Sequence, residues 1–129
     1  MLHFALALGR TALVAIFIWS GFGKLMALDG TAMALASQGL PQPKILAVVA
    51  GLSEVVLGVM VVIGFKTRWA AVGLILFTAV ATYFFHDFWT MSGAAVQTHM
   101  IQAFKNLSMI GGLSAIAIVG AGRFSLDRG

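Results

Sequence analysis

The chain contains no cysteine, only two prolines and only 9% charged residues. The lack of cysteine excludes a thiol redox motif, a disulfide relay, an iron–sulfur cluster and c-type haem attachment on this chain, so redox chemistry would need an external cofactor. Soluble domains carry about a quarter charged residues, and this chain is instead 60% apolar, which indicates an integral membrane protein. The net charge of +4 is small and spread among loops, so we expect lipid headgroups and not nucleic acid as its counterpart.

Four apolar blocks divide the sequence, each near the ~20 residues that a helix needs to cross ~30 Å of hydrocarbon. They cover residues 2–25, 45–63, 69–85 and 100–119. Because these blocks nearly exhaust the chain, we expect one all-α domain over residues 1–129, a four-transmembrane-helix bundle without a soluble catalytic domain. An Ala-Leu-Ala tripeptide at 34–36 resembles a signal-peptidase site, but the apolar segment before it is too long and contains Arg10, so we expect the first helix to be retained.

The basic residues predict the orientation of the bundle in an inner (plasma) membrane. With four spans, the N-terminus, the turn at 64–69 and the C-terminal tail share one side. That side carries Lys66, Arg68, Arg123 and Arg128. The opposite loops offer chiefly Lys44 and the interfacial Lys24, so the positive-inside rule places both termini in the cytoplasm. We expect residues 30–37, in the first external loop, to form one or two helical turns on the membrane surface.

Glu54 is the only glutamate of the chain and lies in the middle of the apolar block 45–63. An ionised carboxylate in such a place must be paired, neutralised or exposed to a water-filled cavity. At 1.5 Å of rise per residue, Glu54 lies close to the midplane, Arg10 about 12 Å deep from the cytoplasmic side, and Lys105 about 8–10 Å deep from the outside. These depths predict that Glu54 pairs with either Arg10 or Lys105.

Helical spacing places the remaining polar residues of each span on one stripe, which we expect to face the bundle interior. The candidate ligand-binding residues on these stripes are Arg10, Lys24, Glu54, His86, His99, Lys105 and Asn106. Two interpretations stay open. The first is a buried ion pair that fixes helix register. The second is a polar pocket open to the external side, in which Glu54, Lys105 and His86 or His99 handle a proton or an anionic or quinone-like ligand. An apolar ring would suit Phe17, Phe84, Phe85 and Met109.

The histidines give no metal or haem motif. His86 and His99 fall at span ends, where imidazoles can reach the interface, and no helix carries the paired histidine spacing of a metal site. The glycines, among them Gly51 and Gly58, recur at three- and four-residue intervals and are expected to serve close helix packing.

Several separated stretches resemble the DoxX family of small four-helix membrane proteins. They are Arg10 with Ile-Phe-Ile-Trp-Ser-Gly-Phe-Gly-Lys-Leu at 16–25, Glu54 followed by Gly58, Gly-Phe-Lys-Thr-Arg-Trp-Ala-Ala from residue 64, His86, and Gly-Ala-Gly-Arg-Phe-Ser-Leu-Asp at 120–127. The resemblance implies an inner-membrane protein of a family often linked to oxidoreductases, named after subunits associated with thiosulfate:quinone oxidoreduction. It also places Arg10, Lys24, Glu54 and His86 on recurring polar positions of the family.

Three functions follow as alternatives. The first is a redox-associated, quinone-interacting subunit of a quinone-linked oxidoreductase, in which Glu54 passes a proton. The second is a non-catalytic accessory or scaffold subunit of a larger membrane complex, which the small size and glycine-lined helices also suit. The expected protein partners are the other subunits of such a complex or, outside this hypothesis, further copies of the chain in a homo-oligomer. A small carrier or channel ranks last, because a single four-helix bundle is narrow and shows no inverted repeat.

Overall fold

The structure is a computed structural model that describes residues 1–127. Within that range the chain forms helices and no strand, in the order α1 (Leu2–Met26), α2 (Leu28–Ser37), α3 (Pro43–Ile63), α4 (Thr67–Phe85), the 3-10 turn η1 (Phe88–Thr90) and α5 (Ala94–Val119). Four of these helical segments are long and apolar enough to cross a membrane, which confirms the predicted all-α, four-span architecture. The fourth span begins at Ala94, six residues before the predicted start, and α2 forms where surface turns were expected.

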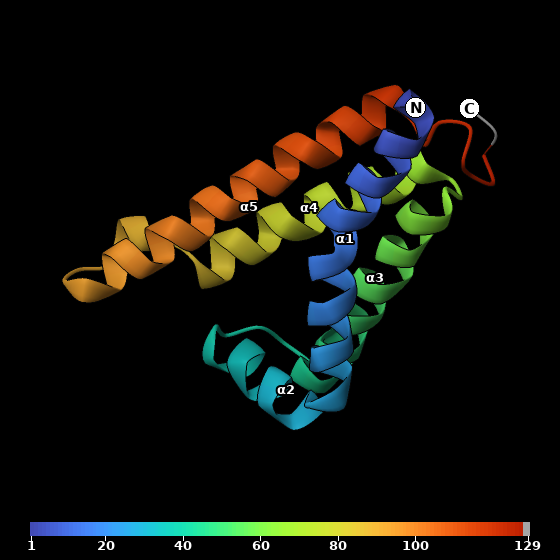
Figure 1. Ribbon diagram of the computed structural model, residues 1–129. Coiled ribbons are helices and arrows are strands. Elements are labelled where there is room, and N and C mark those ends of the chain that lie inside the picture. The colour runs from blue at the N-terminus through green and yellow to red at the C-terminus, as the bar shows by residue number, and fades with distance from the viewer. Residues whose placement is uncertain (128–129) are drawn as a thin grey trace.

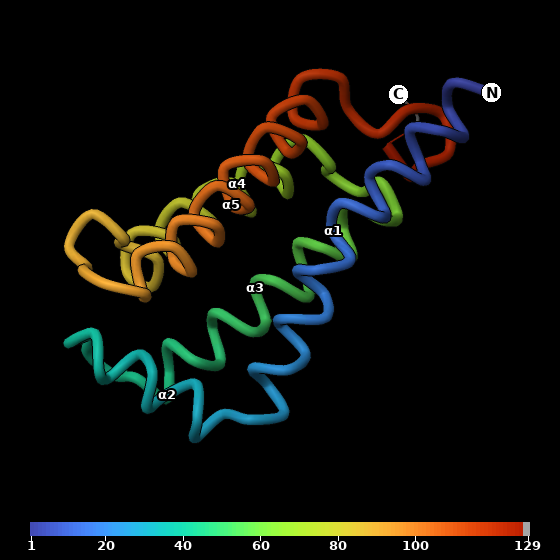
Figure 2. Tube along the Cα trace, turned by 60° about the vertical axis from the view of Figure 1, so that its left-hand side comes forward, coloured from blue at the N-terminus to red at the C-terminus, as the bar shows by residue number. Residues whose placement is uncertain are grey.

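The four long helices make two arms that converge at one end and spread apart at the other. In both views α1 lies beside α3, and α4 lies beside α5 (Figures 1 and 2). The N-terminus and the described part of the C-terminal tail lie at the converged end, and α2 crosses the spread end of the arm formed by α1 and α3 (Figure 1). The cytoplasmic location of the termini stays a prediction of the charge distribution.

A small core holds the arms together where they converge. The buried side chains there come from all four long helices: Val14, Phe17, Val61, Ala70, Ala71, Leu74, Leu113 and Ile116. Outside this cluster most large apolar side chains are exposed on the helix surfaces, as expected for helices that face lipid. The packed end therefore acts as the junction from which the two arms diverge.

Two glycines bring α1 and α3 into backbone contact along their arm. A Cβ on Gly21 would lie 2.7 Å from the Cβ of Glu54 and 2.7 Å from the carbonyl oxygen of Gly51. A Cβ on Gly51 would lie 2.8 Å from the side chain of Leu25. Since real Cβ atoms do not approach so closely, only glycine allows this contact, and the contact fixes Glu54 directly against α1. This is the close packing that the glycine pattern predicted.

Candidate functional site

A cavity of about 880 Å³ occupies the space between the spreading arms. Its wall on one arm comes from α1, α2 and α3, and its wall on the other comes from α4 and α5. Most of its lining is apolar, and the polar side chains that reach it are Ser20, Lys24, Thr31, Ser53, Glu54, Thr78, His86 and Asn106. The helices thus enclose a mainly hydrophobic space with a few polar groups, the usual character of a small-molecule site.

Glu54 forms an ion pair with Lys24 on the cavity wall. The distance between Lys24 Nζ and Glu54 Oε2 is 2.8 Å, and Lys24 Nζ also donates to Ser20 Oγ at 2.7 Å. The Glu54 side chain is only 5% exposed, whereas that of Lys24 is 29% exposed. The carboxylate is therefore held inside the arm, and the ammonium group lies nearer to the open space.

The prediction that Glu54 pairs with Arg10 or Lys105 is wrong, and the geometry of antiparallel helices explains why. Helical side chains lean towards the N-terminus of their own helix. On α1 this lean carries Lys24 back into the bundle from near the helix end, and on α3 it carries Glu54 towards Lys24. A depth counted along Cα positions misses both displacements.

The ion pair has hydrogen-bonding capacity left for a ligand. An ammonium group donates three hydrogen bonds, and Lys24 uses two of them within residues 1–127. A carboxylate accepts up to four, and the hydrogen-bond geometry gives Glu54 one, from Lys24. Ser53, which also lines the cavity, makes no side-chain hydrogen bond within the described residues. Donor and acceptor groups are thus both available at this wall.

The opposite wall carries a weaker polar patch. Asn106 donates from Nδ2 to Thr82 Oγ1 at 2.8 Å, and Thr82 in turn donates to the carbonyl of Thr78 at 2.7 Å. Further towards the spread end, His86 Nδ1 lies 3.1 Å from His99 Nδ1. The structure therefore brings Asn106 and His86 to the cavity, with His99 behind His86.

Lys105 points away from the cavity. It is exposed on the outer surface of α5, makes no ion pair within residues 1–127 and does not line the cavity, although its neighbour Asn106 does. Successive residues of a helix differ by about 100° in direction, so only one of the two can face the interior. The predicted inward stripe of α5 therefore runs through Asn106 and not through Lys105.

Arg10 lies at the converged end, away from the cavity. It is 3% exposed, and its guanidinium donates to backbone carbonyls only. Nε donates to Val61 at 2.9 Å, Nη2 to Val62 at 3.1 Å, and the remaining bonds go to Ala121 and Phe124. Arg10 thus ties the end of α3 and the C-terminal tail to α1.

The apolar side chains named from the sequence all reach the cavity, but several polar ones were missed. Phe17, Phe84, Phe85 and Met109 are part of the lining. Ser20 was overlooked, although it lies four residues before Lys24 and so on the same helical face. Within residues 1–127 no group of three or more acidic or histidine side chains converges on a metal position.

The cavity is open towards the side of the bundle. Three of its lining residues are about half exposed: Ile16 on α1 at 50%, Val49 on α3 at 52% and Val80 on α4 at 56%. All three lie within membrane-spanning helices, where an exposed apolar surface meets lipid. A molecule dissolved in the hydrocarbon therefore has a route into the cavity.

Comparisons with known proteins agree with the resemblance found in the sequence. Residues 5–87 match the family model DoxX. The inner membrane protein YphA of Escherichia coli K12 is 42% identical over 123 residues, which is 95% of this chain and 88% of YphA. The inner membrane protein YqjF of the same organism is 31% identical over 119 residues, 92% of this chain and 86% of YqjF.

A more distant relative comes from a eukaryote. The Surfeit locus protein 4 homolog of Schizosaccharomyces pombe is 36% identical over 70 residues, 53% of this chain and 23% of that protein. No solved structure matches the chain.

Proposed function

The chain belongs to the DoxX family and is a multi-pass inner-membrane protein, and from that premise we propose that its cavity binds a neutral, lipid-soluble molecule with a polar head, of which a quinone is the best candidate. The observation that carries this proposal is the Lys24–Glu54 ion pair in the wall of an 880 Å³ cavity that opens sideways. A redox-associated role would follow from the quinone. The next steps concern the charge, the size and the hydrogen bonds of the ligand.

The charge of the site favours an uncharged head. Lys24 and Glu54 neutralise each other, so a charged headgroup would enter a mainly apolar space without a countercharge. Isolated charges are strongly disfavoured in such surroundings. The pair therefore suits a dipolar group such as a carbonyl or a hydroxyl, and it does not suit the anionic ligand that the sequence left open.

The size and lining of the cavity suit a ring with an apolar tail. Small-molecule sites usually measure about 300–1,000 Å³, and this cavity lies within that range. Phe17, Phe84 and Met109 offer apolar contact to a flat ring. The lateral opening near Val49 and Val80 leaves an alkyl or isoprenoid tail in the hydrocarbon. A ligand of this shape needs no aqueous access to its tail.

The two members of the pair suit both states of a quinone. The unused N–H of Lys24 donates to a quinone carbonyl, and Glu54 accepts a hydrogen bond from a quinol hydroxyl. Glu54 is then the group that takes or returns the hydroxyl proton, with Lys24 adjacent to stabilise the carboxylate. The proton-handling role expected for Glu54 stays a prediction and becomes testable through this contact.

Binding of decylubiquinone to the purified full chain tests the proposal. We expect saturable binding by the wild type and a loss of about 10- to 100-fold in affinity for Glu54→Gln, which removes a charged acceptor but keeps the shape. Lys105→Gln, on the outer face of α5, is the matched control and should bind as the wild type does. Absence of saturable binding by the wild type, or equal affinity of the Glu54→Gln variant, would overturn the proposal.

One observation favours the accessory-subunit alternative. Lys105 lies eleven residues into α5, about 16 Å along the helix, on a face that meets lipid. A lysine near the bilayer centre costs about 2.5–3.5 kcal/mol unless it is paired. A carboxylate on a partner's membrane helix at the same depth would supply that pairing.

Mass spectrometry after purification in a mild detergent tests whether a partner protein binds the chain through Lys105. A second protein that accompanies the wild type but not the Lys105→Gln variant would support the accessory role. Recovery of the wild type only as a monomer or homo-oligomer would contradict it, and the quinone measurement is unaffected by either outcome.

A further inference from the structure

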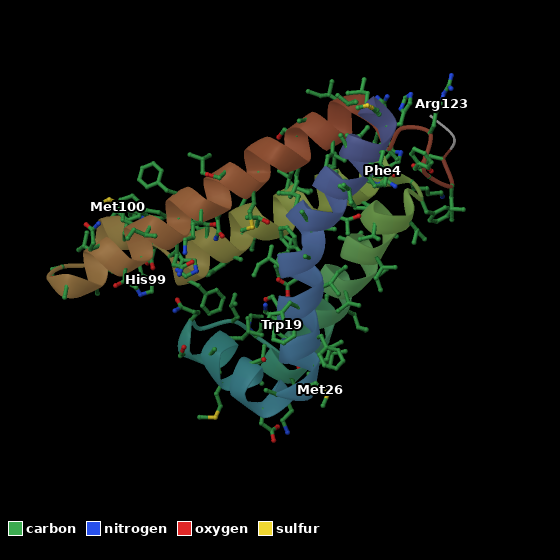
Figure 3. The ribbon with its side chains drawn as sticks, in the orientation of Figure 1. Phe4, Trp19, Met26, His99, Met100 and Arg123 are labelled. Carbon is green, nitrogen blue, oxygen red and sulfur yellow. The ribbon has the colours of Figure 1, made fainter. Side chains whose placement is uncertain are left out.

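His86 and His99 place two imidazole nitrogens face to face at the spread end of the second arm. His86 follows directly after α4, and His99 lies in the second turn of α5. Their Nδ1 atoms are 3.1 Å apart, and their ring centroids are 5.3 Å apart. His99 lies on α5 at the end of that arm away from both termini (Figure 3). Both side chains are half-buried, and His86 is part of the cavity lining.

His99 is held by α5, and His86 by its position directly after α4, where its backbone N–H donates to the carbonyl of Thr82 at 2.9 Å. The helices α4 and α5 pack along most of their length, and η1 between them packs against α5. The connecting segment is further fixed by Thr90, whose hydroxyl donates to the carboxylate of Asp87 at 2.8 Å. The two nitrogens are therefore presented by backbone that is already ordered, which lowers the entropy lost when an ion binds both.

We propose that His86 and His99 form a binding site for a divalent transition-metal ion through their two Nδ1 atoms. Imidazole bonds to zinc measure about 2.0–2.1 Å, so nitrogens 3.1 Å apart subtend about 95–100° at a shared ion. That angle lies between the values for square-planar and tetrahedral coordination, which suits copper, nickel or zinc. Water reaches the half-buried pair and fills the remaining positions.

The charges around the pair favour a cation. Asp87 follows His86 directly, and it is the acidic residue of the segment that joins α4 to α5. The cations of α5 do not face the pair, since Lys105 lies six residues beyond His99 on the outer surface of the helix. Helical spacing alone gave no sign of the site, because one ligand follows the end of α4 and the other lies on α5.

A shared hydrogen bond is the competing explanation of the same distance, and it makes a different prediction. In a neutral pair one Nδ1 carries a proton and the other accepts it. Metal binding needs both Nδ1 atoms free, so the donor imidazole must move its proton to Nε2, with no net proton released. A pair built only for the hydrogen bond would resist that change of tautomer and would bind zinc no better than a single histidine.

The site is tested by titrating the full chain, purified without a polyhistidine tag, with zinc. A colorimetric chelator competes for the zinc and reports the affinity. We expect one Zn²⁺ per chain. Loss of a residue that only orients a metal ligand weakens metal affinity roughly 10- to 100-fold, and His86→Gln or His99→Gln, which removes a ligand itself, should weaken it by more. His3→Gln is the matched control, because His3 is the remaining histidine of the sequence and lies beside Gly122 of the C-terminal tail. It should bind zinc as the wild type does.

Copper binding provides a second test, because a histidine pair with only a structural role would not bind copper through two imidazole nitrogens. The electron paramagnetic resonance spectrum of bound Cu²⁺ should show coupling to two imidazole nitrogens in the wild type and to one in His99→Gln. Zinc affinity equal in wild type and His99→Gln, or a copper spectrum with a single nitrogen in the wild type, would overturn the proposal. Circular dichroism and gel filtration show whether each variant is folded. The decylubiquinone test compares the wild type with Glu54→Gln and Lys105→Gln, so it uses neither histidine variant.

Discussion

Two polar clusters lie at different positions along α1, and each contains one basic residue of that helix. At the converged end, Arg10 is 3% exposed and donates to carbonyls of α3 and of the C-terminal tail. Near the other end, Lys24 pairs with the carboxylate of Glu54 and borders the cavity. Both cations lie in an apolar helix, and the sequence alone gave them the same status as candidate ligand-binding residues.

The two clusters differ in how much hydrogen-bonding capacity stays free once Arg10 and Lys24 have bound their partners. The carbonyls that Arg10 binds belong to the end of α3 and to the C-terminal tail, and the last carbonyls of a helix have no donor within the helix. At Lys24 the partner is a side chain, and donors and acceptors remain beside a cavity. A buried charge in a membrane helix is therefore a candidate functional group only when hydrogen-bonding capacity and space are both left over.

The largest expected effect is that of Arg10→Met. The substitution leaves the carbonyls of Val62, Ala121 and Phe124 without the donors that Arg10 supplies, and each buried unsatisfied group costs about 1–3 kcal/mol. The carbonyl of Val61 keeps only the longer hydrogen bond from the Gly64 N–H, at 3.3 Å. We expect a strongly lowered thermal midpoint in detergent and little protein in the membrane. Fluorescence-detected gel filtration after heating measures both. Wild-type stability of this variant would remove the distinction between the clusters.

A double-mutant cycle at the second cluster should give a smaller loss of stability and a complete loss of binding. Lys24→Met leaves Glu54 as an unpaired buried carboxylate, which costs about 3–5 kcal/mol in a closed interior and less beside a cavity that admits water. Adding Glu54→Gln should restore much of that stability, since no charge remains, while decylubiquinone binding stays lost. If the double variant binds as the wild type does, the pair serves helix register alone.

Gly21→Ala tests whether close packing of α1 against α3 positions the ion pair. The added Cβ would meet the Cβ of Glu54 and the carbonyl of Gly51 at 2.7 Å, so the helices must separate, at a cost of about 1–3 kcal/mol. Ligand affinity should fall as well, because Glu54 moves with α3. Gly23→Ala is the control, since its Cβ would meet nothing within 4 Å. If the two substitutions change ligand affinity equally, the close packing of α1 against α3 does not position the ion pair.

The sequence predicted the helices well because long apolar runs dictate them, and it predicted the burial of Glu54 for the same reason. The sequence did not predict the partner of Glu54 for two reasons. The Gly21–Gly51 contact sets how far α1 is shifted along α3, and the Lys24 and Glu54 side chains, on antiparallel helices, both lean towards each other. The sequence also could not choose between Lys105 and Asn106, because neighbouring residues of one helix fit an inward stripe about equally well. The cavity itself depends on the angle between the arms, which no local pattern encodes.

The C-terminal tail extends the Arg10 cluster, and its last described residue offers a mild test. Asp127 accepts from the backbone N–H groups of Lys66 and Thr67 at 2.7 and 2.8 Å, and from the Thr67 hydroxyl at 2.7 Å. It thereby supplies the start of α4 with the cap that α4 lacks locally. We expect Asp127→Ala to cost about 0.5–2 kcal/mol of stability and to leave ligand binding unchanged.

The same residue gives the stability of the converged end a defined pH dependence. Hydrogen bonds from the Thr67 backbone and hydroxyl and from Lys66, together with the charge of Arg10, lower the pKa of Asp127, and partial burial opposes them only in part. Because the pKa is lowered by folding, the stabilisation is fully present above the unfolded value near pH 4 and is lost as the pH falls through the folded value. Thermal midpoints of the wild type and of Asp127→Asn, which keeps an acceptor but no charge, should differ by a constant amount at neutral pH and converge below about pH 4. A difference that persists unchanged to pH 3 would show that it does not arise from the charge of Asp127.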